Sequence, residues 1–447
     1  MTDTHLPRRE GSLEAPTRHP IDWRSPQFTD AQALHAELHR VFDICHGCRR
    51  CFSLCNSFPT LFDAVDATDT GEVESVPRTA YWQVVEHCYL CDMCYMTKCP
   101  YVPPHEWNVD FPHLMLRAKV KRHEDGETSL RDKVLSATDT VGKLAGIAVV
   151  AETVNAINAS KLGRRALEGV LGVDRNAPLP KYHGKSARSR LADRIGREVE
   201  PNPAGGTAGR VVVFATCYGN RNEPGLVEDL VAVFEHNQIA TALAASERCC
   251  GMPKLELGDL KSIERLKDAN IDELDRWVRD GWDLTAAIPS CVLMFKQELP
   301  LLYPEDERVR RVAEAFYDPF EYLMIRHREG KLHTDFETSL GAISYQVPCH
   351  LRVQNIGLKT RDVLELVPGT KVQPIERCSG HDGTYAVKKE YHQISRKIAR
   401  PVARQVDAAQ ADHFTSDCPM AAAQISSLAE NATATHPLQL LRRAYGI

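Results

Sequence analysis

The sequence contains no apolar run long enough to cross a membrane. Its longest apolar stretch, residues 144–151, is bounded by Lys143 and Glu152, whereas a membrane-spanning helix needs about 20 apolar residues. The segment from Met1 to Pro20 also lacks the apolar core of a secretory signal. We therefore expect a cytoplasmic protein, at most bound peripherally at the inner face of the membrane.

The sequence also lacks an excess of positive charge and a recognisable nucleotide-binding turn. Lys and Arg number 55 against 60 Asp and Glu, for a net charge of -5, so nothing in the charge favours nucleic acid as a partner. The glycines of 205–209 precede a predicted strand instead of following one, which does not fit a dinucleotide-binding turn. Without a flavin or nicotinamide site, hydride chemistry would have to occur on another chain.

Cysteine is what the chain has in abundance, with 15 residues. In a reducing compartment this number points to metal ligands rather than disulfides. Two stretches each place three cysteines at intervals of three residues and a fourth shortly after, a pattern typical of loops that bind [4Fe-4S] clusters. In two-cluster ferredoxins the fourth cysteine ligates the other cluster. The predicted sets are Cys45, Cys48, Cys51 and Cys99 for one cluster, and Cys88, Cys91, Cys94 and Cys55 for the other.

Zinc is the alternative ligand for such cysteines. Structural zinc sites favour two separated cysteine pairs, and the two tandem triplets favour iron and sulfide instead. The stretches depart from the common pattern at Asn56, where a proline is usual, and in one extra residue between Cys94 and Cys99. Neither departure removes a ligand.

The N-terminal half is predicted to be helical. Apolar residues recur on one face of 31–44, and a second helix over 77–86 leads into Cys88. We expect a mobile arm over 1–30, an α-helical ferredoxin-like domain over 31–173 and a linker over 174–209. Residues 135–173 are partly amphipathic, which suits either packing within this half or a docking face for a partner subunit or a membrane.

The C-terminal half contains an internal repeat, predicted as 210–335 and 336–447. Glu247-Arg-Cys249-Cys250-Gly251 matches Glu376-Arg-Cys378-Ser379-Gly380, and the flanking cysteines keep similar intervals. Short β-type runs alternate with helical patterns, which predicts parallel sheets with helices on both faces. Each cysteine follows a predicted strand, so all should converge at the carboxyl ends of the sheets as metal ligands. They are Cys217, Cys249, Cys250, Cys291, Cys349, Cys378 and Cys418.

These motifs resemble the iron–sulfur subunits of anaerobic glycerol-3-phosphate dehydrogenases and the heterodisulfide reductase subunits with Cys-Cys-Gly domains. The resemblance covers about residues 40–447. It implies an α+β multidomain electron-transfer subunit with two [4Fe-4S] clusters and a further iron–sulfur cluster or zinc ion in the repeats. It also implies a redox partner, a flavoprotein dehydrogenase or a reductase, and a quinone or soluble electron acceptor.

The repeats depart from the full Cys-Cys-Gly pattern, because Ile288, Ser379 and Ala421 stand where cysteines are expected. Four cysteines in the first repeat can complete a cubane or a tetrahedral zinc site. Three in the second leave one position open. The candidate ligands for that position are His350, His381, Ser379 or an exogenous group.

Two main functions follow from these patterns. In the first, the chain relays single electrons between a partner enzyme and an acceptor. In the second, it is a disulfide-type reductase that acts at a metal site in the repeats. The missing thiolates favour the relay. In a third interpretation, the repeats form a docking module that is stabilised by bound zinc.

Overall fold

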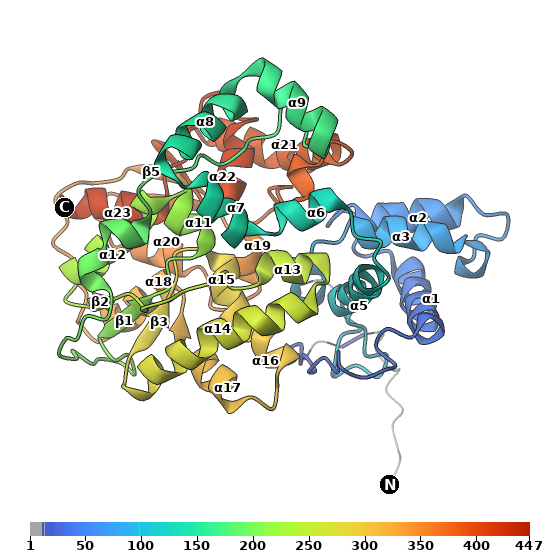
Figure 1. The fold of residues 1–447 in the computed structure, drawn as a ribbon, viewed down its shortest axis with the longest axis horizontal. Coiled ribbons are helices and arrows are strands. Elements are labelled where there is room, and N and C mark those ends of the chain that lie inside the picture. Colours follow the sequence, from blue (N-terminus) through green and yellow to red (C-terminus); the bar gives the residue numbers. More distant parts are fainter. Residues whose placement is uncertain (1–10, 13, 98) are drawn as a thin grey trace, which may run out of the picture. The chain divides into compact units, whose positions relative to one another are not determined.

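The computed structural model describes residues 11–12, 14–97 and 99–447. The chain divides into two compact units, Met1–Glu127 and Thr128–Ile447 (Figure 1). Helices dominate and the strands form two small parallel sheets, so the protein is of the α+β class. The division after Glu127 differs from the predicted domain boundary at 173, because the helices of 130–171 belong to the second unit.

The described part of the first unit is helical and contains no strand. Its elements are α1 (Ala31–Cys48), α2 (Ser57–Asp66), the 3-10 turn η1 (Val73–Ser75), α3 (Arg78–Glu86), α4 (Met93–Thr97) and α5 (Phe111–Glu124). Asp30 begins α1 by accepting a hydrogen bond from the N–H of Ala33 at 2.7 Å. The apolar face predicted for this helix is buried, with Val41 and Phe42 at 1% exposure or less. The helices predicted over 31–44 and 77–86 are thereby confirmed.

Residues 14–30 form neither helix nor strand, yet they are bound to the first unit. The Arg18 guanidinium donates to Asp92 and Asp110, and the Tyr95 hydroxyl donates to the carbonyl of Thr17 at 2.9 Å. This part of the arm predicted to be mobile is therefore attached by specific contacts. Residues 1–10 and 13 lie outside the described residues.

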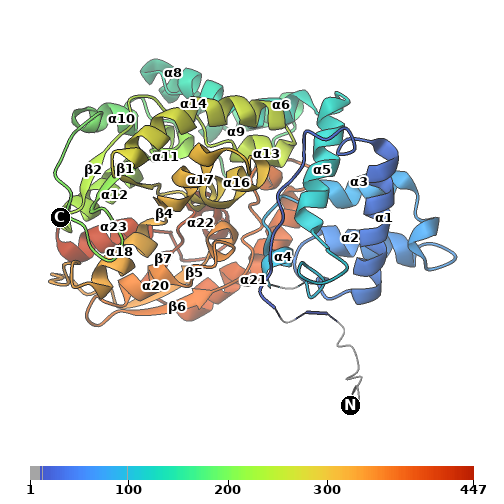
Figure 2. The same cartoon turned by 90° about the horizontal axis from the view of Figure 1, so that it is seen from below.

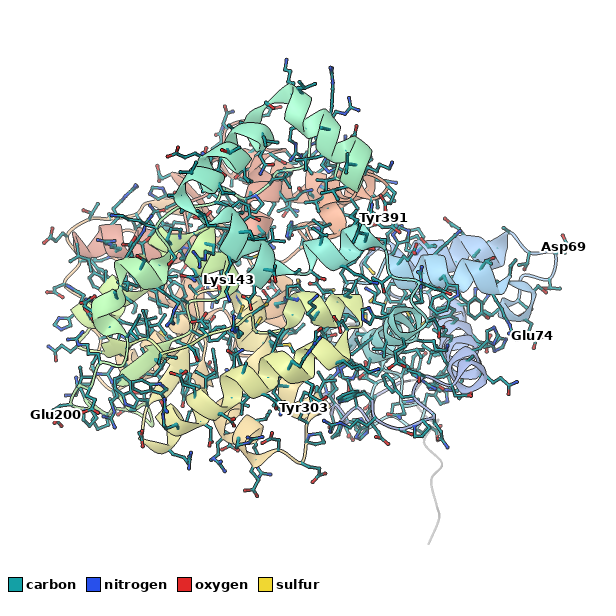
Figure 3. All side chains as sticks on the ribbon, in the orientation of Figure 1. Asp69, Glu74, Lys143, Glu200, Tyr303 and Tyr391 are labelled. Atoms are coloured by element: carbon teal, nitrogen blue, oxygen red, sulfur yellow. The ribbon has the colours of Figure 1, made fainter. Side chains whose placement is uncertain are left out.

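The second unit begins with helices that precede the repeats: α6 (Leu130–Leu135), α7 (Thr138–Ala145), α8 (Ala148–Ala159) and α9 (Lys161–Leu171). Figure 3 marks α7 by Lys143. Within the described chain, no single helix has the length and hydropathy of a membrane span; α7 and α8 reach them only as a pair, bent by 104°. The segment 174–209 contains only the short turns α10 (Ala187–Arg190) and η2 (Ala192–Arg194).

The first repeat is built around a four-stranded sheet in the order β2-β1-β3-β4, with all pairs parallel. Its strands are β1 (Arg210–Val213), β2 (Ala240–Ala242), β3 (Asp283–Thr285) and β4 (Phe316–Tyr317). The helices are α11 (Cys217–Arg221), α12 (Pro224–His236), α13 (Met252–Leu257), α14 (Leu260–Arg279), α15 (Pro289–Leu293), the π-helical turn η3 (Met294–Glu298), α16 (Leu299–Leu302), α17 (Glu307–Glu314) and α18 (Pro319–Arg328). The apolar β1 is fully buried from Val211 to Val213.

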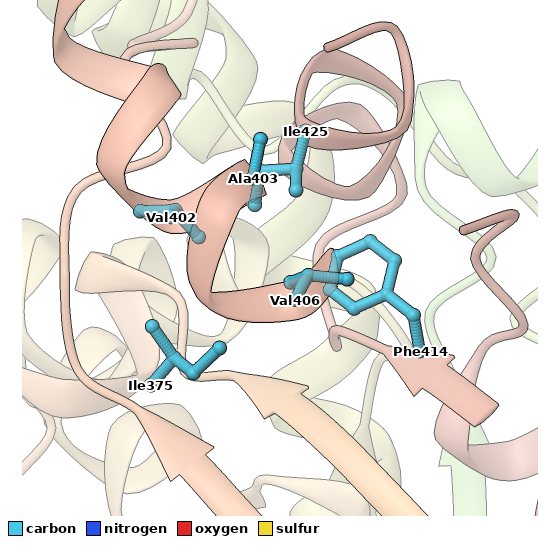
Figure 4. Packing of buried hydrophobic residues seen from close by; sticks show 6 residues of the cluster. All are labelled: Ile375, Val402, Ala403, Val406, Phe414 and Ile425. Atoms are coloured by element: carbon cyan, nitrogen blue, oxygen red, sulfur yellow. The ribbon is translucent and has the colours of Figure 1, made fainter. Parts of the chain in front are cut away.

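The second repeat has a three-stranded parallel sheet in the order β6-β5-β7 (Figure 2). Its elements are β5 (Ala342–Gln346), α19 (Cys349–Arg352), α20 (Lys359–Leu364), β6 (Lys371–Ile375), η4 (Tyr385–Val387), α21 (His392–Ala409), β7 (His413–Thr415), α22 (Pro419–Ser426) and α23 (Pro437–Tyr445). Side chains of α21 pack on the sheet and on α22 (Figure 4). This cluster comprises Ile375, Val402, Ala403, Val406, Phe414 and Ile425.

The two repeats share one packed unit, and their cysteine-bearing ends meet. Helix α15, which carries Cys291, packs against α19, which begins at Cys349. The Gln354 side-chain amide donates to the carbonyl of Pro289 at 3.4 Å across this junction. The predicted parallel sheets and their two-fold repetition are therefore confirmed, and β4 is an additional edge strand that the pattern did not predict.

Candidate metal centres

The first cysteine loop begins in the last turn of α1. Cys45 and Cys48 occupy its last turn, and a spacing of three residues places their thiols on one side of the helix. Arg49 ends the helix with a left-handed φ of 48°, and its N–H donates to the carbonyl of Cys45 at 2.8 Å. A tight turn follows, in which the N–H of Leu54 donates to the carbonyl of Cys51 at 2.9 Å.

Four thiols of the first unit line one cavity, and they are the four assigned to one cluster: Cys45, Cys48, Cys51 and Cys99. Phe58, Phe62 and Val109 contribute apolar walls. Burial raises the pKa of Cys45 well above its usual value, and the neighbouring Cys99 and Cys51 raise it further. The bare thiols cannot all ionise in such a site, so their chemistry fits a bound cationic group that would stabilise them as thiolates.

The second cysteine loop is shaped by two residues with left-handed backbone. Leu90 has a φ of 54° and Asp92 a φ of 58°, one on each side of Cys91. Cys94 lies in α4. Burial raises its pKa, and the charges of Cys88, Cys55 and Cys51 raise it further. Cys55 of the predicted second set therefore acts on this triplet, and so does Cys51 of the first set. Ligation of the clusters themselves stays a prediction.

Charged side chains surround the second loop. Arg18 bridges Asp92, which is 4% exposed, and Asp110. Burial opposes ionisation of Asp110, but His113 and Arg18 outweigh it and hold its pKa far below the ordinary value. The Lys119 ammonium donates to the carbonyl of Cys88 and lies 4.5 Å from the centre of the Tyr89 ring. Two cations therefore lie beside this loop.

The four cysteines of the first repeat follow β1, β2 and β3 and come together as predicted from the strand ends. The sulfurs of Cys217 and Cys249 are 3.9 Å apart, and those of Cys250 and Cys291 are 3.3 Å apart. Both separations exceed the bonded S–S length of about 2.05 Å, and none of the four thiols forms a disulfide.

Helix α7 contributes to this first-repeat site, which the sequence did not predict. The Thr138 hydroxyl lies 3.4 Å from the sulfur of Cys249, and Asp139 accepts the N–H of Cys249 at 2.8 Å. Hydrogen bonds from Cys217, Cys250 and Thr138 lower the pKa of Cys249, whereas the pKa values of Cys217 and Cys250 are raised. Helical periodicity alone gave no signal that Thr138 and Asp139 would lie opposite Cys249, because the contact spans 110 residues or more.

The three cysteines of the second repeat each follow one strand of the sheet: Cys349 after β5, Cys378 after β6 and Cys418 after β7. Burial raises the pKa of the Cys418 thiol to about 11 and that of Cys349 still further. Backbone N–H groups oppose this effect at Cys418, where Met420 and Ala421 donate to the sulfur. The N–H of Gly380 likewise donates to the sulfur of Cys378 at 3.3 Å.

Asp382 is a member of this second-repeat group that the sequence reasoning missed. Its carboxylate oxygens lie 3.7 and 3.8 Å from the sulfur of Cys378, and its charge raises the pKa of both Cys349 and Cys418. The sequence feature that could have identified Asp382 is a carboxylate four positions after a cysteine, in a glycine-rich turn.

The predicted candidates for the open position are Ser379, His350 and His381, and their ligation stays a prediction. Ser379 accepts the N–H of His381 at 3.3 Å, and the N–H of His350 donates to the sulfur of Cys349. Both ring nitrogens of His381 are buried with no hydrogen-bond partner among the described residues, and burial lowers its pKa to about 4. Ile288 and Ala421, which replace cysteines, are 2% and 4% exposed and belong to the core.

Two segments of the chain, 211–296 and 343–426, match the family model described as a cysteine-rich domain. Both repeats are cysteine-rich domains. Each match contains the strand-end cysteines of its repeat, so the sites described above lie within the matched segments.

Characterised relatives extend the similarity beyond the two cysteine-rich domains. The chain is 27% identical over 340 residues to a subunit of the anaerobic glycerol-3-phosphate dehydrogenase of Escherichia coli (strain K12), an alignment that covers 75% of this chain and 82% of the relative. It is 21% identical over 419 residues to a subunit of the fumarate reductase (CoM/CoB) of Methanothermobacter marburgensis, with 89% and 72% covered. Lactate utilization protein A of Oceanobacillus iheyensis is 22% identical over 213 residues, with 46% and 83% covered.

Proposed function

We propose that this chain is an iron–sulfur electron-transfer subunit whose first unit is a helical ferredoxin-like domain with two [4Fe-4S] clusters. The observation that carries the proposal is the cavity lined by Cys45, Cys48, Cys51 and Cys99, in which residues from two distant loops meet. The charge of Cys55 contributes to the raised pKa of Cys94, which supports the complementary assignment. Such an exchange of fourth cysteines is typical of loops that hold two clusters.

When bound, the clusters would supply one-electron carriers. The protein's own residues prepare the sites for them. Apolar side chains such as Phe58 and Phe62 exclude water from the first cavity, which strengthens local electrostatic effects. Arg18 and Lys119 place positive charge beside the second loop and would stabilise the added negative charge of a reduced state there.

The partner is proposed to be a flavoprotein dehydrogenase or a reductase, and the final acceptor a quinone or a soluble carrier. This proposal rests on the names of the relatives, which are subunits of a dehydrogenase and a reductase. The glycines at 205 and 206 lie before β1, so this pair does not form a dinucleotide-binding turn of the usual form. Substrate oxidation is proposed to occur on the partner chain.

We also propose that α7–α9 contact the partner or the inner face of the cytoplasmic membrane. Large apolar side chains are exposed along these helices: Leu144 (62%), Ile147 (55%), Val149 (76%) and Leu162 (78%). Isolated exposed apolar residues are ordinary, but a group on consecutive helices marks an interaction surface. Lys143 and Lys161 lie next to it in sequence and would favour anionic lipid headgroups.

The first cysteine-rich domain is proposed to hold a third centre through its four thiolates. Two thiolates on one tetrahedral zinc ion, at a Zn–S distance of about 2.3 Å, are about 3.8 Å apart. The observed separations of 3.9 and 3.3 Å are close to this value. They support a single zinc ion over a third iron–sulfur cluster, whose cysteines bind different irons.

Metal and sulfide analysis of anaerobically prepared protein tests the proposal. We expect about eight irons and eight sulfides per chain in the first unit. Cys51→Ser and Cys55→Ser should each perturb one cluster, while Cys291→Ser should leave the iron and sulfide unchanged and lower only the zinc. Turnover of a small disulfide with a viologen donor and no partner would favour the reductase alternative instead.

A further inference from the structure

The second cysteine-rich domain gathers three thiols and one carboxylate at the carboxyl edge of its sheet. The thiols come from three neighbouring strands, β6, β5 and β7, and the carboxylate from the turn after β6. We propose that this domain binds one divalent transition-metal ion through a mixed set of ligands. The ligands are Cys349, Cys378, Cys418 and Asp382. The inference deepens the proposed metal binding by the repeats and does not depend on the two clusters of the first unit.

The spacing between Asp382 and Cys378 fits two ligands of the same ion. Their oxygen and sulfur atoms are 3.7 and 3.8 Å apart. A tetrahedral ion with an M–O distance of about 2.0 Å and an M–S distance of about 2.3 Å separates such ligands by about 3.5 Å. Ligands on different irons of a cubane would lie much further apart. The geometry thus favours a mononuclear ion.

A simple thiol–carboxylate hydrogen bond explains only part of this arrangement. It would account for the approach of Cys378 to Asp382, but it does not account for Cys349 and Cys418. These two thiols follow β5 and β7 at the same edge of the three-stranded sheet. Four groups that are all negative when ionised are therefore brought together inside the protein, and a cation is what would offset their repulsion.

The backbone of the turn holds the carboxylate in place. Asp382 has a left-handed φ of 40°, between Gly380 at 68° and Gly383 at 55°. Left-handed backbone is unfavourable for a residue with a side chain. A Cβ on Gly380 would lie 2.3 Å from the carbonyl oxygen of Ser395, so this turn is tightly packed against α21. The aspartate is held by a turn that has little freedom to relax.

Backbone amides also prepare the sulfurs as metal ligands. The sulfur of Cys378 accepts the N–H of Gly380 at 3.3 Å, and the sulfur of Cys418 accepts N–H groups of Met420 and Ala421. Such donors outside the ligand shell stabilise bound thiolates and orient them. Binding of one M²⁺ ion would release the three thiol protons and leave three thiolates and one carboxylate on the ion.

The donor set indicates the class of ion. Three thiolates with one carboxylate oxygen suit Zn²⁺ or Fe²⁺ and do not suit Mg²⁺ or Ca²⁺, which prefer oxygen ligands. The three cysteines follow the three strands of the sheet, so a bound ion would link the carboxyl ends of all three strands. His381, whose buried ring nitrogens have no hydrogen-bond partner within the described chain, lies next to Asp382 in sequence.

The test is elemental analysis of the full-length protein, purified anaerobically, with zinc, iron and acid-labile sulfide counted per chain. Cys378→Ser and Asp382→Ala should each retain about one metal ion fewer than the wild type after dialysis against EDTA, with sulfide unchanged. Asp382→Cys should restore the ion and add one sulfur neighbour in X-ray absorption at the edge of that metal. Glu376→Gln is the matched control, because Glu376 lies on the same loop and pairs with Arg352 at the surface.

Two results would overturn the inference. Unchanged metal content in both ligand variants would show that the four groups hold no ion. Loss of about four irons together with four sulfides would show a cluster instead of a single ion. If the proposed function is wrong, the wild type itself will lack the iron and sulfide of the two clusters. The difference in metal content between wild type and Asp382→Ala would still be present.

Discussion

Arg18 donates from Nη2 to Oδ1 of Asp92 at 3.1 Å, which joins positions 74 residues apart. Asp92 lies inside the second cysteine loop with a left-handed φ of 58°. The same guanidinium donates from Nε to Asp110 at 3.0 Å, at the start of α5. One side chain of the N-terminal segment thereby fixes both the loop that carries Cys91 and Cys94 and the helix next to it.

Removal of this guanidinium should loosen the second loop. Arg18→Gln leaves Asp92 and Asp110 without their shared cation, and breaking such a buried pair costs about 3 kcal/mol. We expect a lower thermal midpoint and faster loss of iron to a chelator under anaerobic conditions. Arg24→Gln is the control, because it removes another guanidinium of the same N-terminal segment, one that stacks on Trp23. Equal iron loss from the two variants would contradict the role given to Arg18.

Asp110 should make the stability of the protein depend on pH in the acid range. Its pKa in the folded protein is held below the ordinary value of about 3.9. The folded state therefore gains stability from ionised Asp110 above about pH 4, and this gain is lost as the pH falls below that value. In urea unfolding, the difference in unfolding free energy between wild type and Asp110→Asn should narrow as the pH falls from 5 to 3.5. A gap that widens with acid would refute the assignment.

Gly380 should tolerate no side chain. Its φ of 68° is left-handed, and a Cβ would lie 2.3 Å from the carbonyl oxygen of Ser395. Gly380→Ala must therefore shift the turn that carries Cys378 and Asp382, and we expect a loss of at least about 1 kcal/mol in stability. Gly357 has a similar φ of 79°, but a Cβ there would have only the end of the Lys359 side chain nearby. Gly357→Ala therefore introduces the backbone strain without the clash, and the difference between the two variants measures the clash. Thermal melts of the two variants compare them directly.

The exposed side chains of α8 and α9 should matter for attachment and little for stability. Val149→Glu combined with Leu162→Glu should reduce co-sedimentation with vesicles of phosphatidylglycerol and phosphatidylethanolamine, or recovery of the anaerobic partner complex. Surface changes of this kind alter folding stability by about 0.5 kcal/mol or less. Leu130→Glu, at a residue that is 74% exposed on α6, is the control. If the double variant behaves like Leu130→Glu in both assays, α7–α9 is not the docking face.

Much of the architecture could be predicted because its signals are local. The strand-end cysteines keep similar intervals in both repeats, and the alternation of short β-type runs with helical patterns predicted the parallel strands correctly. The face of α1 with Val41 and Phe42 followed from helical periodicity. These features depend on residues close in sequence.

The rest depends on contacts between distant residues. Thr138 and Asp139 meet Cys249 from more than 100 positions away, and nothing in a helical pattern specifies such a contact. Asp382 was missed because histidine and serine side chains nearby can also bind a metal, whereas the left-handed backbone of its turn directs the carboxylate to Cys378. Helices 130–171 pack with the repeats, although their sequence lies next to the first unit.

Low-temperature EPR of the reduced protein, recorded together with iron and sulfide analysis, tests the central claim most directly. Anaerobic protein reconstituted with iron and sulfide should be brown, contain about eight irons in its first unit, and show signals of two interacting reduced [4Fe-4S] clusters. Cys94→Ser and Cys45→Ser should each change one cluster's signal. Colourless protein without an EPR signal after reduction would contradict the account.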